Sequence, residues 1–79
     1  MFSYFIIANK LKINNVIKFD SKYYEIMKIV TDKVFPDYLI LDLKSLHINN
    51  VVISITVRKQ YLYIQFVANT LQEAVWINV

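Results

Sequence analysis

The chain contains no cysteine, no glycine, one proline and one histidine in 79 residues. Without cysteine it can form neither a disulfide nor a thiolate metal centre. The single histidine, His47, cannot build a His-rich metal cluster, so we expect no metal and no cofactor. A domain of this length buries only about 60% of the surface of its unfolded chain. Its stability must therefore come from a dense apolar core or from self-association.

The sequence also lacks a long apolar run and a targeting signal. Residues 1–8 are apolar, but Lys10 and Lys12 follow this run, whereas a signal peptide has its basic residues before it. Eight residues cannot cross a bilayer as a helix, which takes about 20. We therefore expect one domain over residues 1–79, a first β-strand within residues 1–8, no membrane contact and a cytoplasmic location.

The residues that are present favour A/T-rich codons. Ile, Asn, Lys, Tyr and Phe make up 38 of the 79 residues, and the chain is 57% hydrophobic. This composition indicates an A/T-rich genome such as that of a virus, a plasmid or a low-G/C microbe; a viral protein would act in the host cytoplasm. The net charge of +3 then has two explanations. It attracts an anionic partner, or it is lysine excess from codon bias.

Turn-forming residues divide the chain into short segments. In the absence of glycine, Asn, Asp and Ser must supply the turns, since they tolerate left-handed backbone and bond to their own backbone. Their spacing favours many short strands. The predicted turns lie at Asn14-Asn15, Asp20-Ser21, Asp37, Asn49-Asn50 and Asn69-Thr70.

Alternating apolar residues predict where the strands lie. Residues 38–43, 51–57 and 61–66 each alternate with a period of two, which is typical of strands with one buried face. They predict an antiparallel three-strand meander over residues 38–66, with residues 58–60 as a hairpin loop. Residues 16–19 and 23–26 predict a further hairpin around Asp20 and Ser21. Residues 21–35 also have apolar positions at helical spacing, so a helix is the alternative there.

The end of the chain has a different pattern. Thr70 and Glu73 have the spacing of a capping box, which predicts a short helix over residues 71–77, with a final strand as the alternative. The predicted fold class is mostly β: a small SH3-like barrel of five to six short antiparallel strands with a short C-terminal helix. If residues 21–35 are helical, the fold is α+β, with that helix packed on a three-stranded meander.

Three segments occur in an order that is known from one family. They are L-K-I-N-N-V-I at residues 11–17, D-S-K-Y-Y-E-I at residues 20–26 and L-D-L-K-S-L at residues 41–46. This order resembles the N-terminal SH3-like barrel of translation elongation factor P and related small barrels, and the likeness covers about residues 11–57. The resemblance implies a barrel fold. The family's modified lysine lies in a glycine-rich loop, but the loop around Lys33 has no glycine, so that function is not carried over.

The sequence contains no catalytic constellation. It has no cysteine, no G-x-S-x-G motif, no glycine-rich phosphate loop and no cluster with metal-ligand spacing. His47 lies beside the Asn49-Asn50 turn without a predicted acid or hydroxyl partner, as expected of a surface loop histidine. We therefore expect a non-enzymatic protein.

The leading prediction is a small module that binds RNA or DNA through basic residues and adjacent tyrosines. Residues 1–28 hold five lysines and two acids, which equals the whole net charge. Basic side chains would hold phosphates while tyrosine rings stack on unpaired bases. Alternatively, the tyrosines pack across strands and the lysines only solubilise an apolar protein. The site comprises Lys10 and Lys12 on one strand face, Lys18 and Lys22 beside a hairpin turn, Arg58 and Lys59 at another, and Tyr61 and Tyr63.

The alternative function is protein interaction. Several predicted strands are apolar on both faces, which exceeds what one small barrel can cover. A homodimer through an edge strand or a two-sided sheet would cover the excess. Ile40, on the nominally polar face of its strand, and Phe35, in the loop before Pro36, are the predicted interface residues. On this hypothesis the chain is a homo-oligomeric protein of a virus or mobile element that binds itself or a host protein. The alternative for Phe35 is a lid on the end of the barrel.

Overall fold

The computed structural model describes residues 4–74 as six antiparallel strands in one sheet, with two single-turn 3₁₀ helices. The mostly β prediction and the expected number of strands are confirmed, and residues 21–35 do not form the alternative helix. The elements are β1 (Tyr4–Ile6), η1 (Ala8–Lys10), β2 (Val16–Phe19), β3 (Lys22–Thr31), β4 (Tyr38–Ser45), β5 (Val52–Arg58), β6 (Ile64–Ala68) and η2 (Gln72–Ala74).

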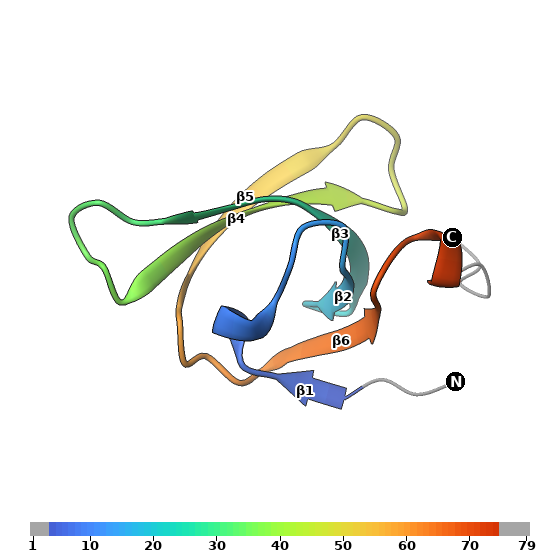
Figure 1. Ribbon diagram of the computed structural model, residues 1–79. Helices are drawn as coiled ribbons and strands as arrows, with labels where there is room; N and C mark the ends of the chain where they lie inside the picture. The colour runs from blue at the N-terminus through green and yellow to red at the C-terminus, as the bar shows by residue number, and fades with distance from the viewer. Residues whose placement is uncertain (1–3, 75–79) are drawn as a thin grey trace.

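The strands follow the order β1-β6-β2-β3-β4-β5, and the sheet curls around its own inner face (Figure 1). Over residues 4–74 it resembles a small barrel but is not closed, since β1 and β5 are its edges there. The ten-residue β3 pairs with β2 through its first residues and with β4 through most of its length. The pairing of β3 with β4 shifts register between Ile26 and Lys28. A bulge of this kind increases strand bending. We call β1, β6, β2 and the start of β3 the β2–β6 half, and the rest of β3 with β4 and β5 the β4–β5 half.

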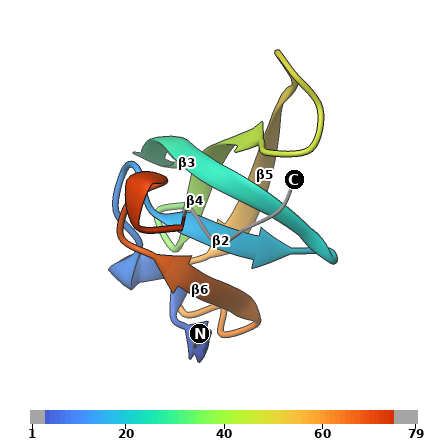
Figure 2. The ribbon, with the colours of Figure 1, turned by 90° about the vertical axis from the view of Figure 1, so that its right-hand side faces the viewer.

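The predicted meander over residues 38–66 is wrong in its last step. β4 and β5 pair as expected, but β6 pairs with β2 and β1. Residues 59–63 therefore cross from the edge strand β5 to β6, which lies between β1 and β2, and are not a hairpin return (Figures 1 and 2). The predicted alternation also fails at its start, where Tyr61 packs against the core and Leu62 is exposed. A period-two pattern shows which residues share a face, but it does not identify the neighbouring strand.

Asn, Asp and Ser do replace glycine in the turns. Four residues in the described part of the chain have positive φ, and none is glycine: Asn14 (77°), Asp20 (52°), Ser21 (63°) and Asn50 (63°). Asp20 and Ser21 form the two-residue connection between β2 and β3, where positive φ at both positions is the signature of a type I′ turn. This turn matches the twist of the hairpin and sets its register.

The main core fills the inside of the curl and draws residues from both halves. Ile17 and Ile64 enter it from the β2–β6 half, and Leu39, Leu41 and Leu43 from β4, in the alternation that the sequence predicts. The buried residues of this cluster are Ala8, Leu11, Ile17, Tyr24, Ile26, Leu39, Leu41, Leu43, Val57 and Ile64.

A second, smaller cluster lies beneath η2. It contains Val16, Val67, Ala68 and Ala74. The backbone N–H of Glu73 donates to Thr70 Oγ1 at 3.3 Å, as the predicted cap requires, while the Glu73 carboxylate accepts from the N–H of Asn69 at 3.1 Å. The segment predicted as a helix over residues 71–77 thus contains a 3₁₀ turn, and its part from residue 75 onward lies outside the described residues.

Candidate nucleic-acid interface

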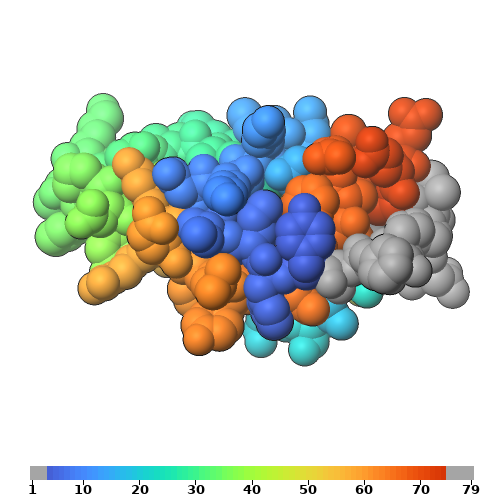
Figure 3. Space-filling view, turned by 60° about the horizontal axis from the view of Figure 1, so that its bottom comes forward, coloured from blue at the N-terminus to red at the C-terminus, as the bar shows by residue number. Residues whose placement is uncertain are grey.

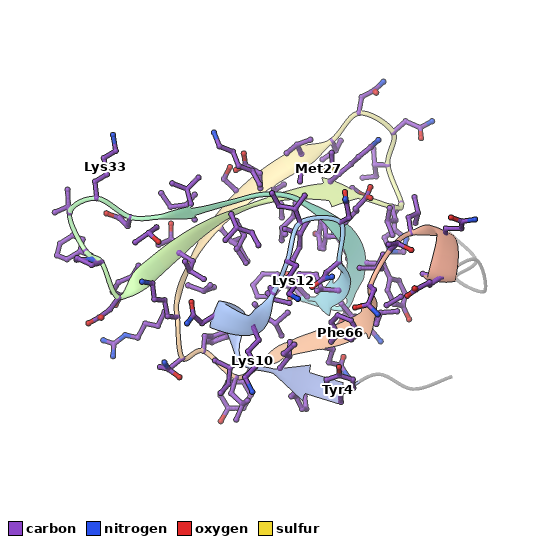
Figure 4. All side chains as sticks on the ribbon, in the orientation of Figure 1. Tyr4, Lys10, Lys12, Met27, Lys33 and Phe66 are labelled. Carbon is purple, nitrogen blue, oxygen red and sulfur yellow. The ribbon has the colours of Figure 1, made fainter. Side chains whose placement is uncertain are left out.

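The predicted basic residues lie in three separate places. Lys10 ends η1 and Lys12 lies in the loop that follows, so the expectation that they share a strand face is wrong (Figure 4). Ala8 and Leu11, three residues apart, are both buried, and the chain between them forms a 3₁₀ turn instead of a strand. Both lysine side chains are exposed, and the backbone N–H of Lys12 donates to Asn15 Oδ1 at 2.8 Å.

Lys18 and Lys22 flank the β2–β3 turn as predicted. Lys18 pairs directly with Tyr23 across the hairpin, and its Nζ lies 5.6 Å from the centre of the Tyr23 ring. Lys22 opposes Phe19 and is exposed. A cation at this distance from an aromatic face is attracted to the ring, so Lys18 and Tyr23 form one basic and aromatic unit.

Arg58 ends β5 and Lys59 begins the crossover, and the Arg58 side chain contacts Tyr38 instead of the predicted tyrosines. Arg58 Nε donates to the hydroxyl of Tyr38 at 3.0 Å, and its guanidinium lies 5.5 Å from that ring's centre. The hydrogen bond to Tyr38 raises the pKa of Arg58 above its usual value. Lys59 is half-buried and shares a surface hollow with Arg58, Gln60 and Asp37. The Asp37 carboxylate would repel an anion in this hollow. Arg58 and Lys59 together are therefore a poorer phosphate site than Lys18.

The two predicted tyrosines differ in exposure. The Tyr63 side chain is 70% exposed, whereas Tyr61 packs against the core. Their rings meet edge to face with centres 5.7 Å apart, and the ring of Phe5 meets that of Tyr63 edge to face with centres 6.2 Å apart. Phe5 itself is 56% exposed. Tyr63 and Phe5 therefore present ring surface to solvent, while Tyr61 links Tyr63 to the core.

Strand pairing joins these groups into one row. Phe5 of β1 opposes Gln65 of β6, Gln65 opposes Lys18 of β2, and Lys18 opposes Tyr23 of β3. Directly opposed residues lie on the same face of a sheet. Tyr23, Lys18, Gln65 and Phe5 therefore cross four adjacent strands on the outer face. We call these four residues, with Tyr63, the aromatic strip.

The view from below the sheet shows one end of this surface. In Figure 3, β1 and the segment of residues 60–68 lie side by side at the centre, and the β2–β3 turn projects beyond them. The strip thus begins at the free edge of β1 and runs toward the hairpin. Its members include two exposed rings, one cation and one amide, and no acidic side chain.

His47 supports the far end of the strip. It is exposed, as predicted for a loop histidine, but it is also a structural partner of β3. The N–H of Tyr23 donates to His47 Nε2 at 3.0 Å, and the two rings stack with centres 5.8 Å apart. Tyr23 is therefore held between Lys18 and His47, which restricts the position of its ring.

Phe5, Tyr23 and Gln65 are not among the site residues predicted from the sequence. The position of Tyr23 could have been predicted. A two-residue turn at Asp20 and Ser21 pairs Phe19 with Lys22, and therefore Lys18 with Tyr23. No local pattern could have placed Phe5 beside Gln65, because β1 and β6 are separated by most of the chain.

The two predicted interface residues lie in the β4–β5 half. Ile40 is half-buried on the outer face, opposed by Val30 and Thr56. Phe35 is 62% exposed and meets the Tyr38 ring edge to face at 6.3 Å. Its loop is held by Asp32, whose carboxylate accepts the N–H groups of Val34 and Phe35 at 2.8 and 3.0 Å. Phe35 thus lies on Tyr38 and borders a pocket of about 300 Å³ lined by Asp32, Tyr38 and Thr56.

Two classes of site are absent from residues 4–74. No group of three or more His, Asp or Glu side chains there is arranged to hold a metal ion. No helix in that range has the length and apolarity to span a membrane. Comparisons with protein-family models, with curated proteins and with solved structures found no match to this chain.

Proposed function

We propose that the protein is a non-enzymatic module that binds single-stranded RNA or DNA through the aromatic strip. The observation that supports this most is the alignment of Phe5, Gln65, Lys18 and Tyr23 across four adjacent strands of the outer face. Neighbouring strands are about 4.8 Å apart. An extended polynucleotide that crosses the strands would therefore meet a ring, an amide, a cation and a second ring in turn.

The chemistry of the strip suits unpaired bases. Exposed aromatic rings stack on any base, at about 1–3 kcal/mol per base. The ammonium of Lys18 would contact a phosphate, and the Gln65 amide has donors and an acceptor for base edges. Paired bases are stacked inside a duplex and cannot reach the rings, so the strip favours single strands.

The other predicted basic residues have a smaller part in this proposal. Lys22, Lys10 and Lys12 are exposed near the strip's hairpin and η1, and they would add a diffuse attraction. Arg58 and Lys59 are assigned no base contact because Arg58 binds Tyr38 and Lys59 shares its hollow with the Asp37 carboxylate. The resemblance to the elongation factor P barrel supports the fold class and adds no residue to the site.

Fluorescence anisotropy with labelled single-stranded and duplex oligonucleotides at two salt concentrations tests the proposal. We expect micromolar binding to single strands that weakens as salt rises, since each lysine contact releases counterions. Lys18→Gln should weaken binding severalfold. Lys33→Gln is the matched control, because it removes the same charge from the tip of the β3–β4 loop, away from the strip (Figure 4).

A second pair of variants tests the rings. Tyr63→Ala and Phe5→Ala should each weaken single-strand binding by about tenfold, in line with 1–3 kcal/mol per stacked base. Phe35→Ala removes an equally exposed ring from the other half and should leave binding unchanged. Equal losses for Lys18→Gln and Lys33→Gln, or equal losses for Tyr63→Ala and Phe35→Ala, would contradict the proposal.

Protein interaction is the second candidate function. It is favoured by a different observation: in the part of the chain that the structure describes, β5 ends the sheet opposite β1 and pairs with β4 alone.

A further inference from the structure

Among the strands that the structure describes in residues 4–74, the edge strand β5 has only β4 as a neighbour. Two bonds define the pattern of this pairing. The N–H of Ser45 donates to the carbonyl of Val51 at 2.9 Å, and the N–H of Lys59 donates to the carbonyl of Asp37 at 2.7 Å. In an antiparallel ladder, hydrogen-bonded and non-hydrogen-bonded pairs alternate. The odd-numbered residues of β5 therefore direct their backbone toward β4.

The even-numbered residues of β5 direct their backbone groups to the open edge. They are Val52, Ser54, Thr56 and Arg58, and all four side chains are exposed. Within residues 4–74, the backbone bonds outside the strands include only one to these groups, from the N–H of Tyr61 to the carbonyl of Arg58. Edge strands are usually protected by a bulge, a proline or a central charge. β5 has none of these between Val52 and Val57.

We infer that β5 pairs with β5 of a second copy of this chain, antiparallel about a two-fold axis at Thr56. An isologous contact of this kind uses the same surface on both copies. In this register Thr56 opposes Thr56 of the second copy, and Ser54 opposes Arg58 of the second copy. Cross-strand threonine pairs are favourable on a sheet surface. The two sheets would continue as one.

Charge complementarity selects the second copy as the occupant. Asp42 is the only acidic residue in β4 or β5, and it accepts a hydrogen bond from Ser54 Oγ at 2.6 Å. Arg58 is the only cation in β5. The proposed register brings Arg58 of the second copy to Ser54, within reach of Asp42, and symmetry forms the same pair twice.

The neighbouring register is less favourable. A two-fold axis at Ile55 would place Arg58 of one copy opposite Val52 of the other, beside Lys44, which opposes Val52 on β4. Like charges at this spacing repel. The axis at Thr56 avoids that contact and still places Ile55 opposite Val57 of the second copy on the inner face. Ile55 is only half-buried in one chain, so the partner strand would complete its burial.

This surface is separate from the aromatic strip, which lies in the β2–β6 half. Dimerisation and nucleic-acid binding can therefore fail independently. A contact made mainly by one strand from each chain is small, and small interfaces are typically weak and transient. We expect a monomer at low micromolar concentration and a dimer at several hundred micromolar.

The chain's lack of cysteine permits a direct test of the register. Hydrogen-bonded antiparallel partners have Cα atoms about 5.5 Å apart, which is within the range for a disulfide. Under mild oxidation, Thr56→Cys should form a disulfide-linked dimer much faster than Thr31→Cys. Thr31 is a matched control, since it is an exposed threonine on the interior strand β3. Equal rates for the two variants would overturn the inference.

Charge exchange gives a second test by sedimentation velocity. Asp42→Arg and Arg58→Asp should each abolish the wild-type dimer, whereas the double variant should restore it. Circular dichroism checks that each variant is folded. A wild-type chain that stays monomeric up to a millimolar concentration would overturn the inference. So would a double variant that is folded but no more dimeric than the single variants.

Discussion

The two halves of the sheet share one core but are built from different kinds of pairing. In the β4–β5 half, strands that follow one another in sequence pair with one another. In the β2–β6 half, the first, second and last strands meet. In the β2–β6 half, the pairing of distant segments brings together side chains that are far apart in the sequence, and these form the aromatic strip. Consecutive pairing ends at an open strand, and the β5 edge is the result.

The largest predicted effect tests whether the halves fold as one unit. Leu41 is fully buried in β4, in the cluster that also holds Ile17 and Ile64 of the other half. Leu41→Ala should lower the free energy of unfolding by about 2–5 kcal/mol, since it leaves a cavity in a small core. Urea unfolding followed by circular dichroism and by tyrosine fluorescence should still show one coincident transition.

Ile40→Ala is the matched control for this experiment. Ile40 is the adjacent residue, half-buried on the outer face, so its truncation removes less buried surface. We expect a loss of about 1 kcal/mol. Two separate transitions in Leu41→Ala would show that the halves are independent. Equal losses for the two variants would contradict the greater contribution of the buried Leu41 to stability.

The second predicted effect concerns Asn15, which immediately precedes β2 in the β2–β6 half. Asn15 is 4% exposed; its Oδ1 accepts from the N–H of Lys12, and its Nδ2 donates to the carbonyl of Asn69 at 3.1 Å. Asn15→Asp keeps the shape but loses the donor, and it sets a carboxylate against a carbonyl. We expect a loss of about 2–3 kcal/mol at pH 7 by thermal unfolding. The exposed Asn49→Asp should change stability little, and a similar loss in both variants would contradict this account.

The fold was predictable where the relevant pairing is local. The Asp20-Ser21 turn and the alternation in β4 and β5 depend on residues within a few positions of one another, and all three were confirmed. The partner of β6 was not predictable. Its residues alternate in the same way whether β5 or β2 lies beside it, and only the packing of the whole curl decides.

In the candidate site too, the contacts that depend on local pairing were predictable and those that depend on distant pairing were not. The Lys18 and Tyr23 pair follows from the hairpin register, which the sequence indicates. The partnership of Phe5 and Gln65 depends on the pairing of β1 with β6, which no local pattern encodes. Arg58 was expected beside Tyr61 and Tyr63, but its side chain bonds to Tyr38 on the preceding strand. Basic residues next to aromatic residues in sequence can therefore lie on different faces.

The third predicted effect compares the tight turns of the two halves. Ser21 has φ of 63° and Asn50 also has φ of 63°. Left-handed backbone costs a non-glycine residue roughly 1–2 kcal/mol, and Asn tolerates it better than Ser. Ser21→Gly should therefore stabilise the protein by about 1 kcal/mol, and Asn50→Gly by less. Differential scanning calorimetry should show a rise of about 4–8 °C for Ser21→Gly. A greater rise for Asn50→Gly would contradict the assignment.

The smallest predicted effect concerns η2, which covers the second cluster in the β2–β6 half. The Glu73 carboxylate accepts from the N–H of Asn69 in an exposed setting, so the net value of the bond is about 0.5–1 kcal/mol. Glu73→Ala should lose that amount, because nothing replaces the acceptor. Glu73→Gln retains a neutral acceptor of the same length and should recover most of it. If the two variants are equally destabilised in urea, the charge of Glu73 and not its hydrogen bond holds η2 over Val16 and Val67, and the salt dependence of the loss would then distinguish the two causes.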